Sequence, residues 1–376
     1  MGRLVFSHPV HHELILHLFP MTGFLKKLIS WYQANARDLP FRHTKDPYLI
    51  WLSEVIMQQT RIDQGVPYYD KFIKVFPTVL DLANAREDEV LKQWQGLGYY
   101  SRARNLHSTA NEVVEKYAGR FPETYDGLRS LKGIGDYTAA AIASVCFGLP
   151  HPVMDGNVIR FITRHFGITA SVDLTAAKKE IIKVLTSLMD GIQRSRNLWD
   201  PGLFNQAMIE FGAICCIPRN PDCNRCIFKT SCYARRNGMV GELPLKKQQK
   251  PLKPRYFNYL VIRVGWGGGL YFNKRSENDI WKGLYEFPLI ETPGSATLTT
   301  LMNSADWKKY FASVQFSVLG QTKAISHLLS HQKIIATFFS IKIEKPYKQF
   351  GSLIPPEKMH ELPVPGLIER YFKDMK

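Results

Sequence analysis

The sequence has no long uninterrupted apolar run and comparatively few acidic residues. Its longest apolar stretch, AAAIASVCFGLP at 139–150, is shorter than the roughly 18 residues that a membrane-spanning helix needs. Residues 1–20 lack the apolar centre of a signal peptide, and Phe6 stands where the myristoylation pattern requires Ser or Thr. The 33 Asp and Glu are outnumbered by 49 Lys and Arg, which gives a net charge of +16. These features favour an intracellular protein without a membrane anchor, whose partner is a polyanion such as nucleic acid.

Alternation typical of strands is nearly absent from about residue 21 to residue 211, where apolar residues recur at helical spacing. This pattern predicts a compact all-α domain of short helices. The segment PLKKQQKPLKPR contains five basic residues, three prolines and no acid, a composition typical of a linker. The segments that follow, such as YFNYLVIRV and IIATFFSIKI, are rich in β-branched and aromatic residues and predict an α+β domain. We therefore expect four parts: an extension at 1–20, the all-α domain at 21–233, a basic linker at 234–255 and the α+β domain at 256–376.

Four of the six cysteines, Cys216, Cys223, Cys226 and Cys232, have the spacing C-x6-C-x2-C-x5-C. In a protein of the reducing cytosol such a cluster indicates metal binding rather than disulfides. Zinc sites usually combine two short C-x2-C units, whereas four thiolates on one loop also suit a [4Fe–4S] cluster. The spacing favours iron–sulfur and leaves zinc open. The other two cysteines, at positions 146 and 215, are interpreted as structural.

One carboxylate, Glu54, interrupts the apolar segment WLSEVIMQQT. A charge buried there alone would cost several kcal/mol. The residues by themselves leave two interpretations, an exposed position on an amphipathic helix or a functional acid. On a helix Glu54 shares a stripe with Ile50, Met57, Gln58 and Arg61, which would place it near polar groups.

Two glycines, Gly133 and Gly135, separate apolar helical segments in LKGIGDYTAAAIAS. Glycines let another backbone approach closely, and the N–H groups at the start of the next helix suit a phosphate. The same pattern also fits an ordinary turn between helices. Asp155, in MDGNVIRF, stands at the start of a later apolar helix, and by itself it is interpreted as an N-cap.

Taken in this order, WLSEVIMQQT, GIGDYTAA, MDGN and the four-cysteine loop resemble the helix–hairpin–helix DNA glycosylases, and in particular the MutY-type adenine DNA glycosylases. RDLPFR, GLGYYSRARNL and FNQAMIEFGA extend the resemblance, which runs from about residue 24 to the C-terminus. It implies a multidomain fold. An all-α helix–hairpin–helix glycosylase domain with an iron–sulfur loop at 216–232 would precede an α+β Nudix-like domain that recognises the lesion.

The resemblance implies a monomeric, monofunctional enzyme that removes adenine mispaired with 8-oxoguanine or guanine in double-stranded DNA. Adenine is a poor leaving group unless it is protonated, so the reaction needs a general acid. Glu54 can be that acid if an apolar pocket raises its pKa. Asp155, at a helix N-terminus, is expected to stay ionised and to stabilise the oxocarbenium-like sugar. The two carboxylates should thus have opposed environments.

Further roles follow from the resemblance, residue by residue. Tyr137 and Asn157 match residues that assist the sugar and Asp155, and the four cysteines match the ligands of a [4Fe–4S] cluster that braces a basic loop. Tyr99 would fill the base stack while adenine is flipped out, although packing of a buried turn is its alternative. Contacts with DNA or its bases are implied for Arg42 and Gln206 (adenine pocket), Gln58, Gln59, Leu97, Tyr99, Lys132, Gly133, Gly135, Ser330 and His331.

Three other functions fit parts of the sequence. An endonuclease III-like enzyme that also cleaves the strand needs a lysine nucleophile, and the family position for it is occupied here by Tyr137. Lys132, just before the hairpin, is interpreted as a phosphate contact. A DNA-binding iron–sulfur protein without catalysis would not need both Glu54 and Asp155. A Nudix hydrolase would need a metal-binding R-E-x-x-E-E helix, which the sequence lacks.

The lesion reader is predicted in HLLSHQ, which resembles the family's H-x-F-S-H loop. This alignment assigns the lesion contacts to Ser330 and His331, with Leu329 in place of the usual Phe. A second alignment, on ISH, would assign Ser326 and His327 instead. Ordinary polar residues at a strand end are the third interpretation.

Overall fold

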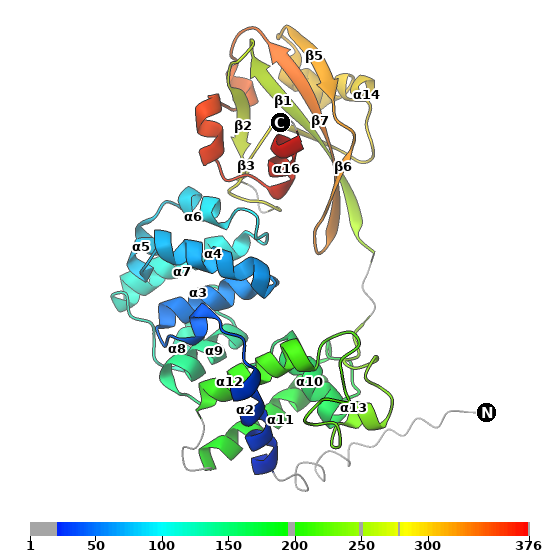
Figure 1. Cartoon of the computed structure of the whole chain (residues 1–376). Helices are drawn as coiled ribbons and strands as arrows, with labels where there is room; N and C mark the ends of the chain where they lie inside the picture. The colour runs from blue at the N-terminus through cyan, green and yellow to red at the C-terminus, as the bar shows by residue number, and fades with distance from the viewer. Residues whose placement is uncertain (1–20, 195–199, 248–250, 277–278, 375–376) are drawn as a thin grey trace, which may run out of the picture. The chain divides into compact units, whose positions relative to one another are not determined.

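The computed structural model describes residues 21–194, 200–247, 251–276 and 279–374 (Figure 1). The chain divides into two compact units, unit 1 with residues 1–80 and 108–248, and unit 2 with residues 81–107 and 249–376. The predicted extension at 1–20 lies outside the described residues. Within the described ranges, no helix is both long enough and apolar enough to cross a membrane.

Unit 1 is helical, as the apolar periodicity predicts. Its elements are α2 (Met21–Asn35), η1 (Pro40–Arg42), α3 (Pro47–Met57), α4 (Ile62–Val75), α8 (Tyr125–Ser130), α9 (Asp136–Phe147), α10 (Gly156–Phe166), α11 (Thr175–Arg194), α12 (Pro201–Glu210), the π-helical η2 (Phe211–Cys215) and α13 (Tyr233–Arg236). Two further helices, α5 (Val79–Asn84) and α7 (Ser101–Tyr117), contain the points at which the chain passes between the units.

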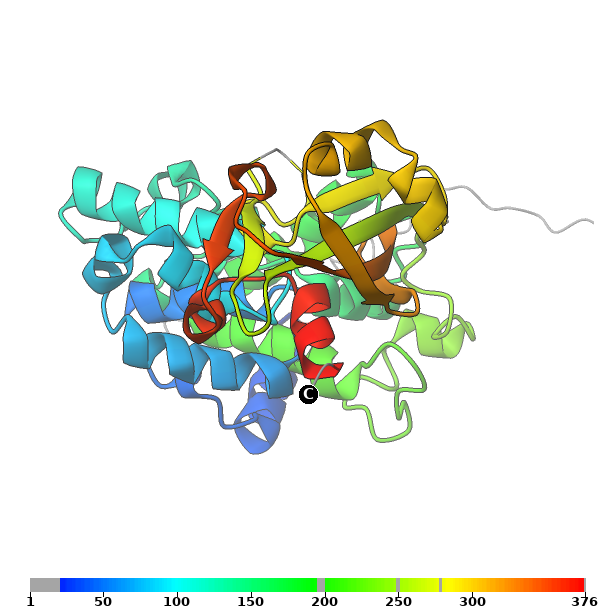
Figure 2. The same ribbon diagram turned by 90° about the horizontal axis from the view of Figure 1, so that it is seen from above.

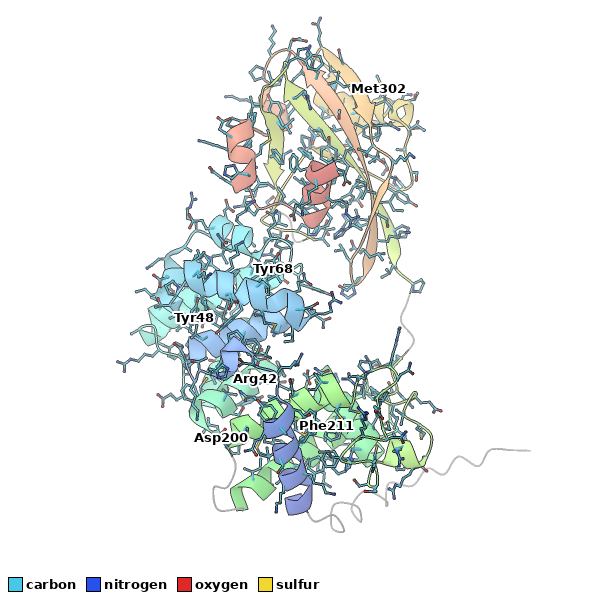
Figure 3. The ribbon with its side chains drawn as sticks, in the orientation of Figure 1. Arg42, Tyr48, Tyr68, Asp200, Phe211 and Met302 are labelled. Atoms are coloured by element: carbon cyan, nitrogen blue, oxygen red, sulfur yellow. The ribbon has the colours of Figure 1, made fainter. Side chains whose placement is uncertain are left out.

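An aromatic cluster forms the core beside the cysteine loop. The ring centroids of Phe24 and Phe228 are 4.6 Å apart, and those of Phe161 and Phe211 are 4.5 Å apart. Phe211 is labelled in Figure 3. Cys216 and other loop cysteines pack against this cluster. Aromatic pairs of this kind contribute beyond their buried area, so the loop rests on a rigid support.

Unit 2 contains a mixed sheet with helices on both faces (Figures 1 and 2). Its strands are β1 (Lys253–Val264), β2 (Leu270–Lys274), β3 (Tyr285–Glu286), β4 (Leu289–Thr292), β5 (Phe316–Gln321), β6 (Ile325–Leu328), β7 (Gln332–Ile343) and β8 (Ser352–Ile354). Its helices are α6 (Glu87–Trp94), α14 (Leu298–Met302), α15 (Ala305–Phe311), η3 (Lys348–Phe350), η4 (Pro356–Glu361) and α16 (Gly366–Asp374).

The sheet is centred on two parallel strands. Its order is β3-β2-β1-β7-β5, with β1 parallel to β7 and with β5 and β6 antiparallel to β7. Neighbouring residues of β7 face opposite sides, because side chains alternate along a strand. Phe338 stacks on Tyr371 of α16 at 4.2 Å, whereas Phe339 belongs to the cluster that contains Trp307 of α15. Both faces of β7 are therefore buried.

The predicted domain boundaries differ from the structure in two places. Residues 233–236 form α13 and Leu243 is buried, and β1 already begins at Lys253. The predicted linker at 234–255 therefore contains structured segments at both ends, which its polar composition did not reveal.

The second difference is that residues 81–107 belong to unit 2 rather than to the helical unit. Backbone and side-chain contacts explain this assignment. Lys92 Nζ donates to Leu362 O at 3.1 Å, and Arg104 Nη1 donates to Lys282 O at 2.6 Å. Such pairs lie far apart in the sequence, so helical periodicity could not predict them.

Candidate active site

Glu54 lies in the last turn of α3 and lines a cavity of about 890 Å³ in unit 1. Helix α3 begins at Pro47, and its N-cap Asp46 accepts a hydrogen bond from Tyr48 N at 2.8 Å. Ile50 and most other side chains of the helix are buried. Glu54 is half-buried, so it does not lie on an exposed helix face.

Burial raises the pKa of Glu54 from 4.5 to about 7, because the ionised form loses its hydration. A hydrogen bond with Tyr137 acts in the opposite direction, and the nearby charge of Asp155 raises the pKa further. Burial and the two carboxylates raise the pKa of Tyr137 well above 10, so its neutral hydroxyl donates to Glu54. Near pH 7 Glu54 is therefore poised between its acid and base forms.

Asp155 caps α10 and lines the same cavity. Its carboxylate accepts hydrogen bonds from Asn157 N at 3.0 Å, Val158 N at 2.8 Å and Asn157 Nδ2 at 2.8 Å. Burial raises its pKa above the usual 3.8, and these three donors oppose the rise. The expected opposition between the two carboxylates therefore stays a prediction. Burial raises both pKa values, and the donors around Asp155 distinguish it from Glu54.

A buried ion-pair network adjoins this cavity. Glu210, on α12, accepts hydrogen bonds from Arg37 Nε and Nη2, both at 2.7 Å, and from Arg42 Nη2 at 2.5 Å. Burial opposes ionisation, yet these partners lower the pKa of Glu210 to about 2. Arg37 also lines the Glu54 cavity. Neither Arg37 nor Glu210 was predicted as a site residue, although both lie in the segments RDLPFR and FNQAMIEFGA.

Arg42 and Gln206, predicted for one adenine pocket, line a second cavity of about 400 Å³ together with Asp200. Arg42 and Asp200 are labelled in Figure 3. Tyr32 OH donates to Gln206 Oε1 at 3.0 Å, and the Arg42 guanidinium lies 5.5 Å from the Tyr32 ring centre. The structure thus brings these predicted residues together, and Glu210 links their cavity to Arg37 in the Glu54 cavity.

The helix face that was predicted to carry Glu54 together with Gln58 and Arg61 ends before these two residues. Helix α3 ends at Met57, so Gln58 is its C-cap and Arg61 is the N-cap of α4. Gln58, Gln59 and Arg61 nevertheless line the cavity, and Gln58 Nε2 donates to Thr138 Oγ1 at 3.2 Å. Gln59 has a φ of 58°, an unfavourable backbone state that is concentrated at functional sites.

The predicted hairpin joins α8 to α9. Gly133 has a φ of 82°, which a side chain would make costly, and Gly135 is the N-cap of α9. Both glycines and Lys132 are exposed. A hydrogen bond fixes the turn to α7, because Lys132 N donates to Glu112 Oε2 at 3.2 Å. The N–H groups of Lys132 and Ile134 are bonded within the protein, whereas the exposed Gly133 and Gly135 leave the backbone of the turn open to a phosphate.

Arg160 joins the Asp155 region to the cysteine loop, a connection that was not predicted. Its Nη2 donates to Asn157 Oδ1 at 2.9 Å and to Gly212 O at 2.6 Å, and its Nε donates to Cys216 O at 2.7 Å. At Gly212 a Cβ would lie 2.5 Å from Asn157 O, so glycine permits the close approach of η2 to α10. Because Asn157 also donates to Asp155, the carboxylate and the loop share one network.

The four predicted ligands, Cys216, Cys223, Cys226 and Cys232, line one cavity. The Cys216 sulfur accepts from Arg164 Nη1 at 3.6 Å, and the Cys226 sulfur accepts from Phe228 N at 3.4 Å. In the described part of the chain, no three His, Cys, Asp or Glu side chains lie close enough to hold a single metal ion. Basic residues of the same loop are exposed at positions 219, 225 and 229.

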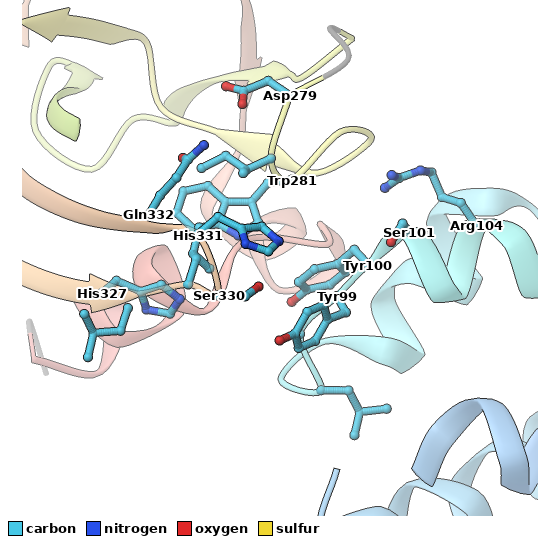
Figure 4. Close-up of a pocket in the computed structure, with 15 residues that line it drawn as sticks. Tyr99, Tyr100, Ser101, Arg104, Asp279, Trp281, His327, Ser330, His331 and Gln332 are labelled. Atoms are coloured by element: carbon cyan, nitrogen blue, oxygen red, sulfur yellow. The ribbon is translucent and has the colours of Figure 1, made fainter. Parts of the chain in front are cut away.

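A cavity of about 360 Å³ in unit 2 brings together the residues predicted to read the lesion (Figure 4). Ser330 and His331 are exposed in the turn between β6 and β7, where Leu329 N donates to Gln332 O at 2.9 Å. Leu97 and Tyr99 line the same cavity. Tyr99 is 48% exposed with a φ of 47°, so the alternative of a tyrosine packed in a buried turn is wrong.

Of the two residues in the second alignment, Ser326 and His327, the structure places only His327 at the unit 2 cavity. His327 lines the unit 2 cavity, and its ring lies edge-on to Trp281 with centroids 5.8 Å apart. Ser326 is exposed on β6 and is absent from the described lining of that cavity. The geometry therefore favours the turn at 329–331.

Comparisons with known proteins agree with this architecture. The model of the HhH-GPD superfamily of base excision DNA repair proteins matches residues 52–187, and that of the NUDIX domain matches residues 258–374. A solved thermostable thymine-DNA glycosylase aligns with a TM-score of 0.52 and 29% identity over 58% of this chain and 97% of its own. The predicted fold class, a helical glycosylase domain followed by an α+β Nudix-like domain, is confirmed.

Two curated relatives define the family more closely. The adenine DNA glycosylase of Buchnera aphidicola subsp. Acyrthosiphon pisum is 35% identical over 276 residues, 73% of this chain and 76% of that protein. The human adenine DNA glycosylase is 39% identical over 385 residues, 87% of this chain and 69% of that protein. The chain therefore belongs to the adenine DNA glycosylases, enzymes of base excision repair that cleave the bond between adenine and its deoxyribose in DNA.

Proposed function

We propose that the substrate is adenine paired with 8-oxoguanine or guanine in duplex DNA. Oxidation at C8 converts N7 of guanine from a hydrogen-bond acceptor into an N–H donor, so a reader must offer an acceptor at that edge. Ser330 and His331 supply acceptor atoms at the rim of the unit 2 cavity, beside Tyr99. An aromatic side chain that is half-exposed there suits stacking on a base.

Glu54 protonates the departing adenine, and Asp155 stabilises the sugar cation. The observation that carries this assignment is that one cavity holds both carboxylates, with the pKa of Glu54 at about 7. General acids work best when their pKa lies near the working pH. Tyr137 and Asn157 orient the two carboxylates through the hydrogen bonds described above.

The enzyme acts without a covalent amine intermediate. Strand cleavage by an endonuclease III-like route needs a lysine amine at the sugar, and the described lining of the Glu54 cavity contains no lysine. Tyr137 occupies the position expected for that amine. Borohydride reduction during turnover should therefore trap little protein on DNA, and Tyr137→Lys should increase the trapped fraction.

The cysteine loop holds a [4Fe–4S] cluster. Its four thiols line one cavity with apolar walls that include Phe161 and Phe228, and thiolates are the ligands such clusters take. A single zinc ion needs its four ligands gathered around one point, and no three described His, Cys, Asp or Glu side chains are gathered in that way. The cluster would brace the exposed basic side chains of the loop against DNA.

Single-turnover excision tests these roles. Duplexes with adenine opposite 8-oxoguanine, guanine or thymine are incubated with wild type and Glu54→Gln, and strand breaks are scored with and without alkali. Wild type should produce alkali-dependent breaks opposite 8-oxoguanine and guanine. Glu54→Gln should lose about 10²–10⁴-fold in rate while still binding the mispaired duplex. Full activity in Glu54→Gln would refute its role, and equal rates with thymine would refute the proposed substrate.

A further inference from the structure

Arg255, the last residue of the predicted basic linker, is committed to contacts inside unit 2. It lies on β1, and 21% of its side chain is exposed. Its guanidinium donates to Glu291 from Nε at 2.7 Å and from Nη2 at 2.8 Å, and to Asp279 from Nη1 at 2.9 Å and from Nη2 at 2.8 Å. Nη1 also donates to Gln332 Oε1 at 3.2 Å. A guanidinium has five N–H donors, so these bonds leave none for a DNA phosphate.

Two of these partners line the unit 2 cavity, in segments that are far apart in the sequence (Figure 4). Gln332 is the first residue of β7 and directly follows the turn between β6 and β7. Asp279 begins the segment 279–281, all of which lines the cavity. Glu291 belongs to β4 and is absent from the described lining. Arg255 therefore joins two parts of the cavity wall and attaches both to β4.

Trp281, two residues after Asp279, has a backbone conformation that needs support. Its φ is 61°, a state that is costly for a side chain of this size. A second arginine, Arg275, donates from Nη2 to Asp279 Oδ2 at 2.8 Å and from Nε to Ile280 O at 2.9 Å. Asp279 thus bridges Arg275 and Arg255. Contacts with two arginines therefore fix the position of Trp281 in the cavity wall.

We propose that Arg255 is a positioning residue for the choice of partner base. It fixes the turn between β6 and β7 relative to Trp281, so that the acceptor of Ser330 meets the N7–H of 8-oxoguanine. The inference rests on the proposed reading of that lesion at the unit 2 cavity. A hydrogen bond weakens steeply when its donor and acceptor are misaligned, so a small shift of the turn lowers the preference for 8-oxoguanine. Arginine suits this role because its planar fork bridges several acceptors, whereas a lysine ammonium is a point charge.

Arg255→Met and Arg255→Lys in the full-length protein test this proposal, by single-turnover excision of adenine opposite 8-oxoguanine and opposite guanine. Both variants should lose about tenfold in preference for 8-oxoguanine, because neither side chain can hold Asp279, Glu291 and Gln332 together. The rate opposite guanine at saturating enzyme should remain at the wild-type value. Lys253→Met is the matched control, since Lys253 is exposed on β1 and pairs with Gln332 in the parallel register. It should keep the wild-type preference.

A double variant, Arg255→Met with Glu291→Gln, guards against a loss of folding. Arg255→Met alone leaves two carboxylates without this cation. In the double variant Glu291 is replaced by a neutral amide, and Asp279 keeps its hydrogen bond from Arg275. Removing both members of an ion pair is often close to neutral for stability. The double variant should therefore fold and show the same loss of preference.

Each other result contradicts the proposal. An unchanged preference in the Arg255 variants would show that the turn is fixed without this side chain. A wild-type preference in Arg255→Lys, or an equal loss in Lys253→Met, would show that positive charge on β1 is enough. Slower excision on both duplexes by the same factor, or failure of both the single and the double variant to fold, would assign Arg255 to the stability of unit 2. A wild type without preference for 8-oxoguanine would instead refute the proposed reading of the lesion, so the two failures are distinguishable.

Discussion

At the scale of single residues, Glu54 links catalysis to stability. Its pKa is about 7 in the folded chain and near 4.5 in an unfolded one. Between these values the unfolded chain has released the proton while the folded chain still holds it. Stability therefore falls as the pH rises from about 4.5 to about 7. At about 1.4 kcal/mol per pH unit, the loss approaches about 3 kcal/mol.

Replacing Glu54 with glutamine should remove this loss. We expect Glu54→Gln to be more stable than wild type at pH 8, by up to about 3 kcal/mol, and the difference to vanish towards pH 4.5. Urea unfolding at both pH values measures it. Asp63→Asn is the control, since the Asp63 side chain is 70% exposed. A difference between Glu54→Gln and wild type that does not change with pH would contradict the buried-acid assignment.

At the scale of elements, Asp155 is both the N-cap of α10 and a proposed catalytic group, and two substitutions separate these roles. Asparagine caps helices nearly as well as aspartate, whereas alanine costs about 1 kcal/mol. Asp155→Asn should keep most of the stability but lose excision, because an amide cannot balance a sugar cation. Asp155→Ala should lose both. Thermal unfolding and single-turnover excision check this, and an active Asp155→Asn would leave Asp155 as an N-cap alone.

The Arg160 network predicts that the cysteine loop influences the chemistry through α10. Arg160→Met leaves the carbonyls of Gly212 and Cys216 without their donor, and each unpaired carbonyl costs about 1–3 kcal/mol of stability. The same change frees Asn157 to rotate away from Asp155. We expect slower excision at saturating enzyme. Arg219→Met, at an exposed position of the same loop, is the control and should weaken DNA binding without changing that rate. If Arg160→Met weakens DNA binding but leaves the excision rate at saturating enzyme unchanged, Arg160 acts through binding only.

Local sequence patterns predicted the features that depend on neighbouring residues, and missed the contacts between residues far apart in the sequence. The capped helices at Glu54 and Asp155 and the glycine hairpin were predictable, because caps and periodicity are local. The end of α3 at Met57 was not, since the polar residues that follow, at positions 58–61, include no glycine or proline that would mark a helix end. Glu210 and Arg37 are 173 residues apart, so only the folded chain shows that they form an ion pair.

At the scale of the whole molecule, the proposed chemistry and the proposed reading of the lesion belong to different units. Glu54 and Asp155 lie in unit 1, and Ser330 lies in unit 2. Residues 97–101 and Arg104, from the middle of the helical sequence, also belong to unit 2 and line its cavity. A division of the chain by composition could not detect this segment, because the helices α6 and α7 on either side of it follow the same helical pattern as unit 1.

This division predicts that the choice of partner base and the removal of adenine can be changed independently. In the variant Ser330→Ala with His331→Ala, the N7–H of 8-oxoguanine loses its acceptors. An unpaired buried donor costs about 1–3 kcal/mol, so the preference for 8-oxoguanine over guanine should fall roughly ten- to a hundredfold. Adenine removal opposite guanine should persist, because Glu54 and Asp155 are unchanged.

Binding and single-turnover excision on both duplexes measure this preference. Ser326→Ala is the matched control, since it removes an exposed hydroxyl from β6, outside the described lining of the cavity. It should leave the preference as it is in wild type. If the double variant keeps its preference and Ser326→Ala loses it, the reader is the alignment on Ser326 and His327. Loss of excision on both duplexes in the double variant would instead show that the turn supports catalysis rather than recognition of the oxidised base.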